Sequence, residues 1–460
     1  MRKLALLAVV IMGLGAASML FADDVFRPTT GEEKLLGGFE GETVPREWEP
    51  NADTKLSIST EHATEGKQSL KVEMSKGAYP GVGLVGRAQD WSTYDALRFT
   101  VFNQNAGTVW CTVRVDDATS RGIGSRFSMD DHVVAIRINN GVNDIEVPIC
   151  ALKQGTPESQ GLDATRIKQF KFFIGDLKRD AVLFFDNVRL VREERKAPDV
   201  LPIADFDKPP GKITAGAGAV VTEVDNPSGK DGKCAKIDLS PEADYPSVYI
   251  TAPADWLSYD LVCIDIFCPE AVATPNNLAF KVTDSTGRGQ TFCTGLVKGM
   301  NEVCIPMEAL SFLSPGRVKD FSLFWSKLNA NMTVYVDNVR LERAKLADYP
   351  TRHAVGAAAD KFLIDYTAIP RGKNTCYMAT TWVPLKAGGY RVVRCNSPDK
   401  KQLSYGIDAD AFKDADEKKP VRVWTMFLDH GVWSLCEAFV PLKKDGQTKF
   451  SLDDAMRFGN

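Results

Sequence analysis

The chain has 460 residues, of which 44% are hydrophobic and 25% charged, a composition typical of globular proteins. At roughly 150 residues per domain, this length predicts about three domains. Arg2 and Lys3 precede an apolar run that ends near Ala22, so residues 1–22 are predicted to be a secretory signal peptide, with an uncleaved anchor as the alternative. Loss of these two basic residues would take the net charge from −4 to −6. That balance disfavours nucleic acid as a partner and, after signal cleavage, a membrane.

Two segments of the remaining chain repeat one pattern. Module 1, residues 35–194, opens with Phe39-Glu40, and module 2, residues 199–344, opens with Phe206-Asp207. Both continue through short alternating strands separated by Gly, Pro, Asn and Asp turns, which is typical of an antiparallel β-sandwich. The same landmarks recur in order: Tyr79-Pro80 and Tyr245-Pro246, Asp-Trp-x-x-Tyr-Asp at 90–95 and 255–260, Arg121-Gly122 and Arg288-Gly289, and a closing strand at 182–190 and 334–341.

Each closing strand contains the sequence Asp-Asn-Val. Alternation at period two predicts that Phe184, Val188 and Leu190 face one side of the strand, and it places Asp186 in the same buried phase. An unpaired buried carboxylate is costly. We therefore expect Asp186, and Asp337 in module 2, to meet a metal ion, an arginine or several backbone N–H groups.

Residues 345–460 are predicted to form a third, β-rich domain, either a degenerate sandwich or an unrelated small β fold. A helical start is expected at 354–365, followed by strands at 378–385, 390–395, 403–407, 421–427 and 435–442. Asp453-Asp454 near the end loosely repeats the closing motif. The whole chain is thus predicted to be all-β, with tandem antiparallel sandwiches and a β-rich C-terminal domain.

The opening Phe-acid pair, the Asp-Trp-x-x-Tyr-Asp motif and the Asp-Asn-Val strand resemble those of the galactose-binding-like jelly-roll family, which includes many carbohydrate-binding modules. The resemblance covers about two thirds of the chain and implies two facing sheets, a sugar site on a concave face or at loop tips, and often a structural calcium. Carried onto this chain, the calcium ligands would be Glu40 with Asp186 and Asp207 with Asp337. Two carboxylates are only part of the six to eight oxygens that calcium takes, so hydrogen bonds from backbone N–H groups or an arginine remain the alternative.

Candidate sugar contacts lie in the outward phase of the strands. Trp110 is such a residue, flanked by Arg114 and Asp116, and its alternative role is to cover a neighbouring module or loop. Lys281 is the counterpart of Arg114 in module 2, and Arg121 and Arg288 lie in equivalent polar turns where a ligand or a local carboxylate would engage them. The outward phenylalanines recur in both modules, which favours packing between modules or beneath a loop: Phe102, Phe173, Phe267 and Phe324.

No catalytic constellation is evident in the sequence. The four histidines show no metal-ligand spacing, and the GxGxxG pattern at 81–86 leads into a strand where a dinucleotide fold needs a helix. Cys263 and Cys304 fall where module 1 has Arg98 and Glu146, in outward phases, and are candidates for a disulfide.

These patterns together predict an exported, non-catalytic protein that binds a polysaccharide or glycan in a secreted, periplasmic or cell-surface setting. The first alternative is a structural or protein-docking component of a cell-envelope or surface assembly. The second is a carbohydrate-active hydrolase, which would require one sandwich to be catalytic itself.

Overall fold

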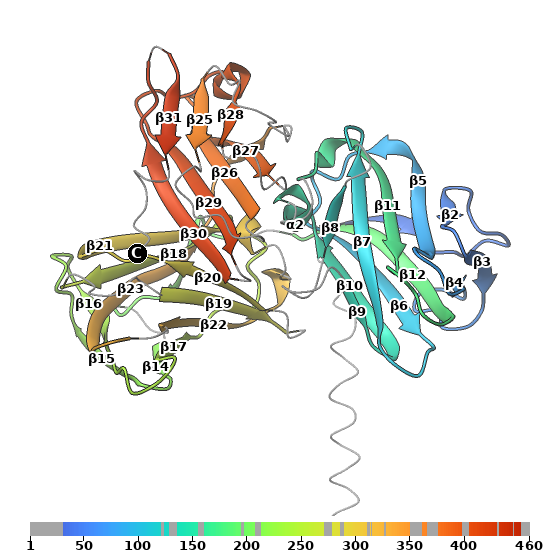
Figure 1. The fold of residues 1–460 in the computed structure, drawn as a ribbon, viewed down its shortest axis with the longest axis horizontal. Helices are drawn as coiled ribbons and strands as arrows, with labels where there is room; N and C mark the ends of the chain where they lie inside the picture. The colour runs from blue at the N-terminus through green and yellow to red at the C-terminus, as the bar shows by residue number, and fades with distance from the viewer. Residues whose placement is uncertain are drawn as a thin grey trace, which may run out of the picture.

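A computed structural model of the protein describes residues 31–120, 124–127, 136–154, 161–194, 197–207, 213–270, 278–285, 289–310, 313, 315–325, 328–349, 361–365, 376–397, 404–429, 432–444 and 446–451. Within these residues nearly all of the regular secondary structure is β-strand, arranged as two sandwiches and a C-terminal domain (Figure 1). No helix among them is long and apolar enough to cross a membrane. The predicted signal peptide and the Asp453-Asp454 motif lie outside the described residues.

Module 1 is a sandwich of two antiparallel sheets. Its back sheet, the one with the closing strand, has the order β10-β6-β12-β4-β3, with β1 also paired to β12. The strands are β1 (Glu32–Gly37), β3 (Thr54–Ser59), β4 (Ser69–Met74), β6 (Ala96–Asn103), β10 (Gly141–Pro148) and β12 (Ala181–Arg192). Its front sheet has the order β2-β5-β11-β7-β8, with β9 also paired to β7. These strands are β2 (Trp48–Pro50), β5 (Gly81–Gln89), β7 (Val109–Asp117), β8 (Ser125–Phe127), β9 (Ile136–Ile138) and β11 (Ile167–Phe173).

Module 2 repeats this strand order. Its back sheet runs β15-β16-β23-β18-β21 with β13 paired to β23, and its front strands run β14-β17-β22-β19-β20. The back strands are β13 (Val200–Ala204), β15 (Ala219–Asp225), β16 (Lys233–Leu239), β18 (Leu261–Cys268), β21 (Gly299–Pro306) and β23 (Met332–Glu342). The front strands are β14 (Ile213–Ala215), β17 (Ser247–Ile250), β19 (Leu278–Asp284), β20 (Gly289–Thr294) and β22 (Val318–Trp325). The predicted duplication and the antiparallel jelly-roll fold are therefore confirmed.

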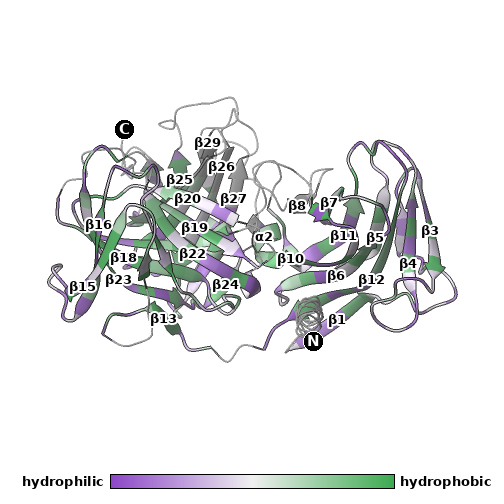
Figure 2. Ribbon diagram, turned by 90° about the horizontal axis from the view of Figure 1, so that it is seen from below, coloured by the Kyte–Doolittle hydropathy of each residue, from purple (hydrophilic) through white to green (hydrophobic). Residues whose placement is uncertain are grey.

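Alternating hydrophobic residues fill the space between the two sheets of each module, and Figure 2 shows the resulting alternation of hydropathy along the strands. In β7 the core residues are Cys111, Val113 and Val115, as the sequence predicts. Trp91 and Trp256, from the Asp-Trp-x-x-Tyr-Asp motifs, are fully buried in the two cores. Short helical turns connect the strands: α2 (Ile149–Gln154), η1 (Ala164–Arg166), η2 (Met307–Ala309) and η3 (Pro315–Arg317).

The predicted phase of the closing strand is wrong. Phe185, rather than Phe184, shares the core with Val188 and Leu190. The reason is a β-bulge: Asn187 adopts a left-handed conformation with φ of 49°, and the register with β6 shifts between Asp186 and Arg189. The extra residue reverses the alternation within the strand. Asp186 is consequently buried on the outer side of the back sheet instead of between the sheets.

Module 2 has the same bulge at Asn338, with φ of 50°. An arginine two residues further on braces each bulge: Arg189 Nη1 donates to the Asn187 carbonyl, and Arg340 Nη1 to the Asn338 carbonyl, both at 3.1 Å. The repeated Asp-Asn-Val-Arg sequence thus encodes a bulge and its brace.

The C-terminal domain continues the front sheet of module 2. Strand β30 pairs in parallel with β20, and the sheet then runs β30-β29-β26-β27-β24. These strands are β24 (Leu346–Asp348), β26 (Cys376–Pro384), β27 (Tyr390–Ser397), β29 (Val421–Asp429) and β30 (Val432–Val440). A second layer covers one face of this sheet, with β28 (Ser404–Ile407), β25 (Phe362–Asp365), β31 (Thr448–Ser451) and η4 (Ala409–Phe412). The predicted strands are confirmed. The helical expectation is wrong at residues 362–365, where Phe362 and Ile364 alternate into the core as a strand.

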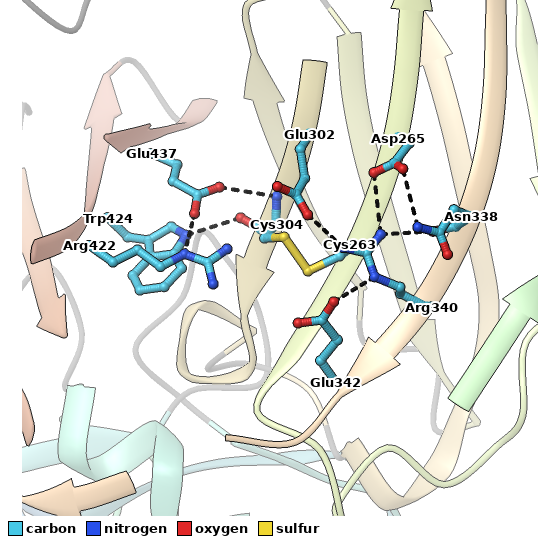
Figure 3. Close-up of a disulfide and its surroundings, with 10 residues drawn as sticks. All are labelled: Cys263, Asp265, Glu302, Cys304, Asn338, Arg340, Glu342, Arg422, Trp424 and Glu437. Carbon is cyan, nitrogen blue, oxygen red and sulfur yellow. Dashed lines mark hydrogen bonds and ion pairs between the residues drawn. A yellow bond between two sulfur atoms is a disulfide. The ribbon is translucent and has the colours of Figure 1, made fainter. Parts of the chain in front are cut away.

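The other face of this sheet shares a hydrophobic core with module 2, through residues that include Trp382, Trp424 and Leu435. Its strands also protect the edge strand β21. Trp424 Nε1 donates to the Cys304 carbonyl at 3.0 Å, and the Cys304 N–H donates to Glu437 at 3.3 Å (Figure 3). An unpaired sheet edge is prone to association, so these two side chains close the edge that module 2 would otherwise present.

The two modules meet through equivalent ends. Arg317 of η3 donates to Asp144 of β10 at 2.6 Å in a largely buried ion pair, and α2 of module 1 contacts η2 of module 2. A cavity of about 760 Å³ lies at this junction, lined by residues 92–95 and 257–260 and by residues of the C-terminal domain. Two residues that line this cavity form a buried ion pair, in which Arg394 Nε of the C-terminal domain donates to Glu308 of module 2 at 2.8 Å.

Candidate carbohydrate-binding faces

The outward face of each front sheet is the candidate functional site. In module 1 this face is formed by the side chains of β5, β11 and β7 that point away from the core. Gly81 and Gly83 occupy β5 there and contribute no side chain. Both glycines are buried, and a Cβ would meet Phe173 Cβ at 2.8 Å from Gly81 and Lys171 Cγ at 3.2 Å from Gly83, so the glycines let these β11 side chains lie over the sheet.

Aromatic side chains gather at one end of the module 1 face. Tyr79, just before β5, is 63% exposed, and its ring meets that of Phe173 edge to face at 5.9 Å. Phe173 pairs in register with Thr112, and Trp110 follows two residues along β7 on the same face. Trp110 is 42% exposed, so neither a loop nor a module covers it among the described residues. Rings that stand free above a sheet suit the apolar C–H face of a sugar.

Polar side chains form a row beside this aromatic end. Arg114 donates from Nε and Nη2 to Asp116 Oδ1, at 2.9 and 2.8 Å, and Gln169 donates to the other oxygen of Asp116. Asp116 is 2% exposed and accepts two hydrogen bonds from Arg114, so it holds the Arg114 guanidinium in place on this face. Lys171 stands between Gly83 and Arg114 and has no ion-pair partner within the described part of the chain.

Module 2 presents a related face with different side chains. Tyr245 is 60% exposed and meets Phe324 edge to face at 6.2 Å, repeating the Tyr79–Phe173 pair. Tyr249, 51% exposed, occupies the place of Gly83 and pairs in register with Ser322, whose other neighbour is the exposed Lys281. Lys281 has no ion-pair partner among the residues that the structure describes.

Sequence reasoning located part of this site and missed the rest. Trp110, Arg114 and Lys281 lie on the predicted faces, whereas the side chains of Arg121 and Arg288 lie outside the described residues. Three exposed tyrosines were not predicted as candidate sugar contacts: Tyr79, Tyr245 and Tyr249. The recurring Tyr-Pro dipeptide marks the first two, but only the fold shows that each tyrosine stands against a phenylalanine of β11 or β22. Of the other outward phenylalanines, Phe102 lies beneath a loop as expected, stacked on His62 at 3.5 Å.

In module 1, the two proposed calcium ligands flank one loop between β3 and β4. Asp186 Oδ2 accepts hydrogen bonds from Thr64 N at 2.6 Å, Thr64 Oγ1 at 3.0 Å and Glu65 N at 2.9 Å. Glu40 Oε1 accepts from Lys67 N at 2.9 Å and Gln68 N at 3.0 Å, and its Oε2 accepts no hydrogen bond within the described residues. Asp186 thus meets several backbone N–H groups, one of the expected outcomes. Asp186 Oδ1 also accepts from Asn187 N at 2.7 Å, so Glu40 Oε2 is the carboxylate oxygen of this pair that remains open to a cation.

In module 2 the corresponding carboxylates have different surroundings. Asp207 accepts from Lys233 N at 2.8 Å, and Asp337 accepts from Asn226 Nδ2 at 2.8 Å and Asn338 N at 2.7 Å. Burial, and then the charges of Asp265 and Asp205, raise the pKa of Asp337 above its ordinary value. Among the residues described, no cluster of three or more His, Cys, Asp or Glu side chains is arranged to hold a metal. Asp265, the register partner of Asp337, is paired with Lys230 and Arg340, so the carboxylates around Asp337 already meet positive charge and do not fit calcium.

Comparison with known proteins gives partial similarities. No protein-family model matches the chain. Beta-agarase A of Vibrio sp. (strain JT0107) is 23% identical over 181 residues, which cover 33% of this chain and 18% of that protein. The chain therefore spans less than a fifth of the length of that curated relative.

Solved structures that resemble parts of the chain include an exo-beta-agarase, with 18% identity over 35% of this chain and 26% of that one and a TM-score of 0.28. The family 11 carbohydrate-binding module of the cellulase Lic26A-Cel5E of Clostridium thermocellum is 18% identical. The match covers 37% of this chain and 100% of that module, with a TM-score of 0.28. The tandem CBM22-1–CBM22-2 domain of Paenibacillus barcinonensis Xyn10C is 15% identical. The match covers 69% of this chain and 99% of that domain pair, with a TM-score of 0.24. The strand order of each module defines an antiparallel jelly-roll sandwich.

Proposed function

We propose that the protein binds polysaccharide through the front faces of its two modules and catalyses no reaction. The observation that carries the proposal is the repeated pair of an exposed tyrosine against a phenylalanine, Tyr79 with Phe173 and Tyr245 with Phe324. Each pair stands beside polar side chains that can orient hydroxyl groups. The partial sequence similarity to a β-agarase supports a polysaccharide as the ligand class.

Tandem faces raise the avidity for a polymer when both engage one chain. The buried Arg317–Asp144 pair and the shared junction hold the modules against each other, which limits the freedom lost on bivalent binding. We propose that module 1 contributes Trp110, Tyr79 and Arg114, and that module 2 contributes Tyr245, Tyr249 and Lys281.

The test is binding of the mature chain to agarose, xylan and mixed-linkage β-1,3-1,4-glucan, measured by affinity electrophoresis and titration calorimetry. Tyr79→Ala and Trp110→Ala are each expected to weaken binding roughly tenfold, about 1.4 kcal/mol. Phe439→Ala is the matched control, because Phe439 is 55% exposed on the C-terminal domain, on a strand outside both modules. It is expected to bind like the wild type.

Other outcomes separate the alternatives. Retention of full affinity by both front-face variants would exclude the face of module 1 as the binding site. Absence of glycan binding, with a stable protein complex recovered instead, would favour a docking component. Release of reducing sugar that survives stringent purification would establish a hydrolase.

We also propose that the protein is exported and acts outside the cytoplasm. The signal-like residues 1–22 support this, and so does the disulfide between Cys263 and Cys304, because such bonds persist in oxidising compartments. Sequencing the N-terminus of the mature protein tests it, with cleavage after Ala22 as the expected result.

A structural calcium in module 1 is a further part of the proposal, with Glu40 and Asp186 as the residues that would hold it. A bound calcium would supply positive charge that ties the loop at 60–68 to the closing strand. Its test is the number of calcium ions that the full-length mature chain binds.

A further inference from the structure

Module 2 carries one more carboxylate than module 1 at the bulge of its closing strand. Asp265 of β18 and Asp337 of β23 are register partners on adjacent strands, and Asp265 is buried. At the same place in module 1, Asp186 faces Thr100, a neutral residue. Two adjacent carboxylates repel each other in a partly buried setting, so module 2 needs compensating positive charge that module 1 does not.

Lys230 supplies that charge. Its Nζ lies 2.7 Å from Asp265 Oδ2, which also accepts from Asn338 Nδ2 at 3.1 Å. Arg340 reaches Asp265 Oδ1 at 3.3 Å, but its guanidinium is also shared with Glu302 at 2.6 Å and with a third carboxylate (Figure 3). Among the ion pairs recorded for the described residues, Lys230 makes only the one with Asp265.

The loop that carries Lys230 is shaped for this contact. It spans residues 226–232 between β15 and β16 and is closed by a hydrogen bond from Asn226 N to the Gly232 carbonyl at 2.9 Å. Gly229 and Gly232 both have positive φ, 86° and 100°, which lets the loop turn tightly. Asn226 also donates its side-chain N–H to Asp337 at 2.8 Å. This one loop therefore donates a hydrogen bond to each of the two carboxylates.

In module 2, hydrogen-bond donors and positive charges already occupy the carboxylate oxygens that a metal ion would bind. Both oxygens of Asp265 and both oxygens of Asp337 accept hydrogen bonds or ion pairs from side chains or from Asn338 N. Calcium needs six to eight oxygen ligands with available lone pairs. In module 1 both oxygens of Asp186 also accept hydrogen bonds, from backbone N–H groups and a threonine hydroxyl. The difference is one of charge, because the described residues contain no lysine or arginine ion pair to Asp186 or Glu40, whereas Asp265 has two.

We propose that the ammonium of Lys230 is the resident cation of module 2, and that module 2 therefore binds no calcium, in contrast to the calcium proposed for module 1. The two copies then stabilise the same bulged strand by different means. Neither role depends on whether the front faces bind glycan.

The test counts the calcium ions bound per full-length mature chain, by calorimetry and by equilibrium dialysis of calcium. Lys230→Met is expected to bind one more calcium ion than the wild type, because Asp265 and Asp337 are released. Lys233→Met is the matched control: Lys233 begins β16 directly after the loop, is equally exposed, and pairs at 2.8 Å with Glu223 rather than with Asp265. It is expected to leave the count unchanged.

Two further variants keep the test decisive if Lys230→Met does not fold. Asp337→Asn in the wild-type background is expected to leave the calcium count unchanged, and loss of one ion would overturn the proposal. Lys230→Arg keeps the positive charge and is expected to bind as many ions as the wild type. The proposal would also be overturned if a folded Lys230→Met chain bound the same number of calcium ions as the wild type. A wild-type chain that binds no calcium would refute the module 1 site alone, because the expected difference of one ion remains.

Discussion

Arg98 and Glu146 form a fully buried ion pair, with Nε 2.8 Å from Oε2, at the two positions where module 2 has its disulfide between Cys263 and Cys304. In both modules the two residues are direct register partners on the outer side of the back sheet. Glu193 adds a second carboxylate, 2.9 Å from Arg98 Nη2. One copy of the repeat thus joins these strands with charge and the other with a covalent bond.

Breaking the ion pair is predicted to destabilise module 1. Glu146→Gln leaves the buried guanidinium with less compensating charge, and such changes cost about 3 kcal/mol. Glu73→Gln is the control, because Glu73 pairs with Lys71 at 3.8 Å on the surface, where a pair contributes below about 1 kcal/mol. Urea unfolding of both variants measures the difference. Equal free energies of unfolding for the two variants would contradict the prediction.

Replacing the pair by Arg98→Cys together with Glu146→Cys offers a check on the same relationship. Because the positions match those of Cys263 and Cys304, the double variant is expected to form a disulfide under oxidising conditions. Titration of free thiols before and after reduction would show it. A chain in which both new thiols stay free would contradict the equivalence of the two sites.

The repeat and the fold class could be predicted because they depend on local patterns that recur along the chain. Alternation placed Cys111 and Val113 in the core, and the matching of Cys263 with Arg98 pointed to the disulfide. The phase of the closing strand could not be predicted in this way. A single left-handed residue, Asn187, reverses the alternation. The sequence alone does not show that an asparagine within a strand adopts a positive φ.

Only part of the candidate binding faces could be predicted, because some of their contacts join segments that are far apart in the sequence. Trp110 could be placed by counting along one strand, whereas the contact between Tyr79 and Phe173 joins segments almost a hundred residues apart. The continuity of the C-terminal domain with module 2 was also hidden, because parallel pairing of β20 with β30 leaves no local signal.

The bulge makes a specific prediction for Asn187. A β-branched residue is strained at a φ of 49°, so Asn187→Val is expected to lower the free energy of unfolding by about 1–3 kcal/mol. Asn187→Gly adopts this φ without a steric penalty and serves as the control. Chemical unfolding of the two variants tests the bulge directly. If valine were tolerated as well as glycine, the left-handed conformation would not be required.

Asp117 predicts a pH dependence for module 1. Burial alone would raise the pKa of Asp117, but hydrogen bonds from Asp163 N, from Thr119 and from Ser120 outweigh it and hold the pKa below its ordinary value. A depressed folded pKa contributes stability that is present above the unfolded value of about 3.9 and is lost as the pH falls through the folded value. The loss is therefore expected in the acid range below about pH 4.

Asp117→Asn isolates this contribution, since the other carboxylates titrate alike in both proteins. The stability difference between wild type and variant is expected to shrink as the pH is lowered from about 5 to about 2. Urea midpoints measured across this range provide the readout. A difference that stays constant or grows towards low pH would exclude Asp117 as the cause.

Substitutions of Trp424 test how far the stability of module 2 depends on the C-terminal domain. The indole is fully buried, donates to the Cys304 carbonyl at 3.0 Å, and lies 4.8 Å from the ring of Trp382. Trp424→Phe keeps most of the apolar surface but leaves the carbonyl at the β21 edge unpaired, at a cost of about 1–3 kcal/mol. Trp424→Ala also opens a cavity in the shared core and is expected to cost about 3–5 kcal/mol.

Trp110→Phe is the matched control, because Trp110 is half exposed and donates no recorded hydrogen bond within the described residues. It is expected to change the free energy of unfolding by less than about 0.5 kcal/mol. Because Trp424 lies in the core that module 2 and the C-terminal domain share, its variants should lower the unfolding midpoint of both together and leave module 1 unaffected. Hydrogen exchange resolved by peptide separates the three units. Loss of protection confined to the C-terminal strands would show that module 2 folds without the cover that its β21 edge has here.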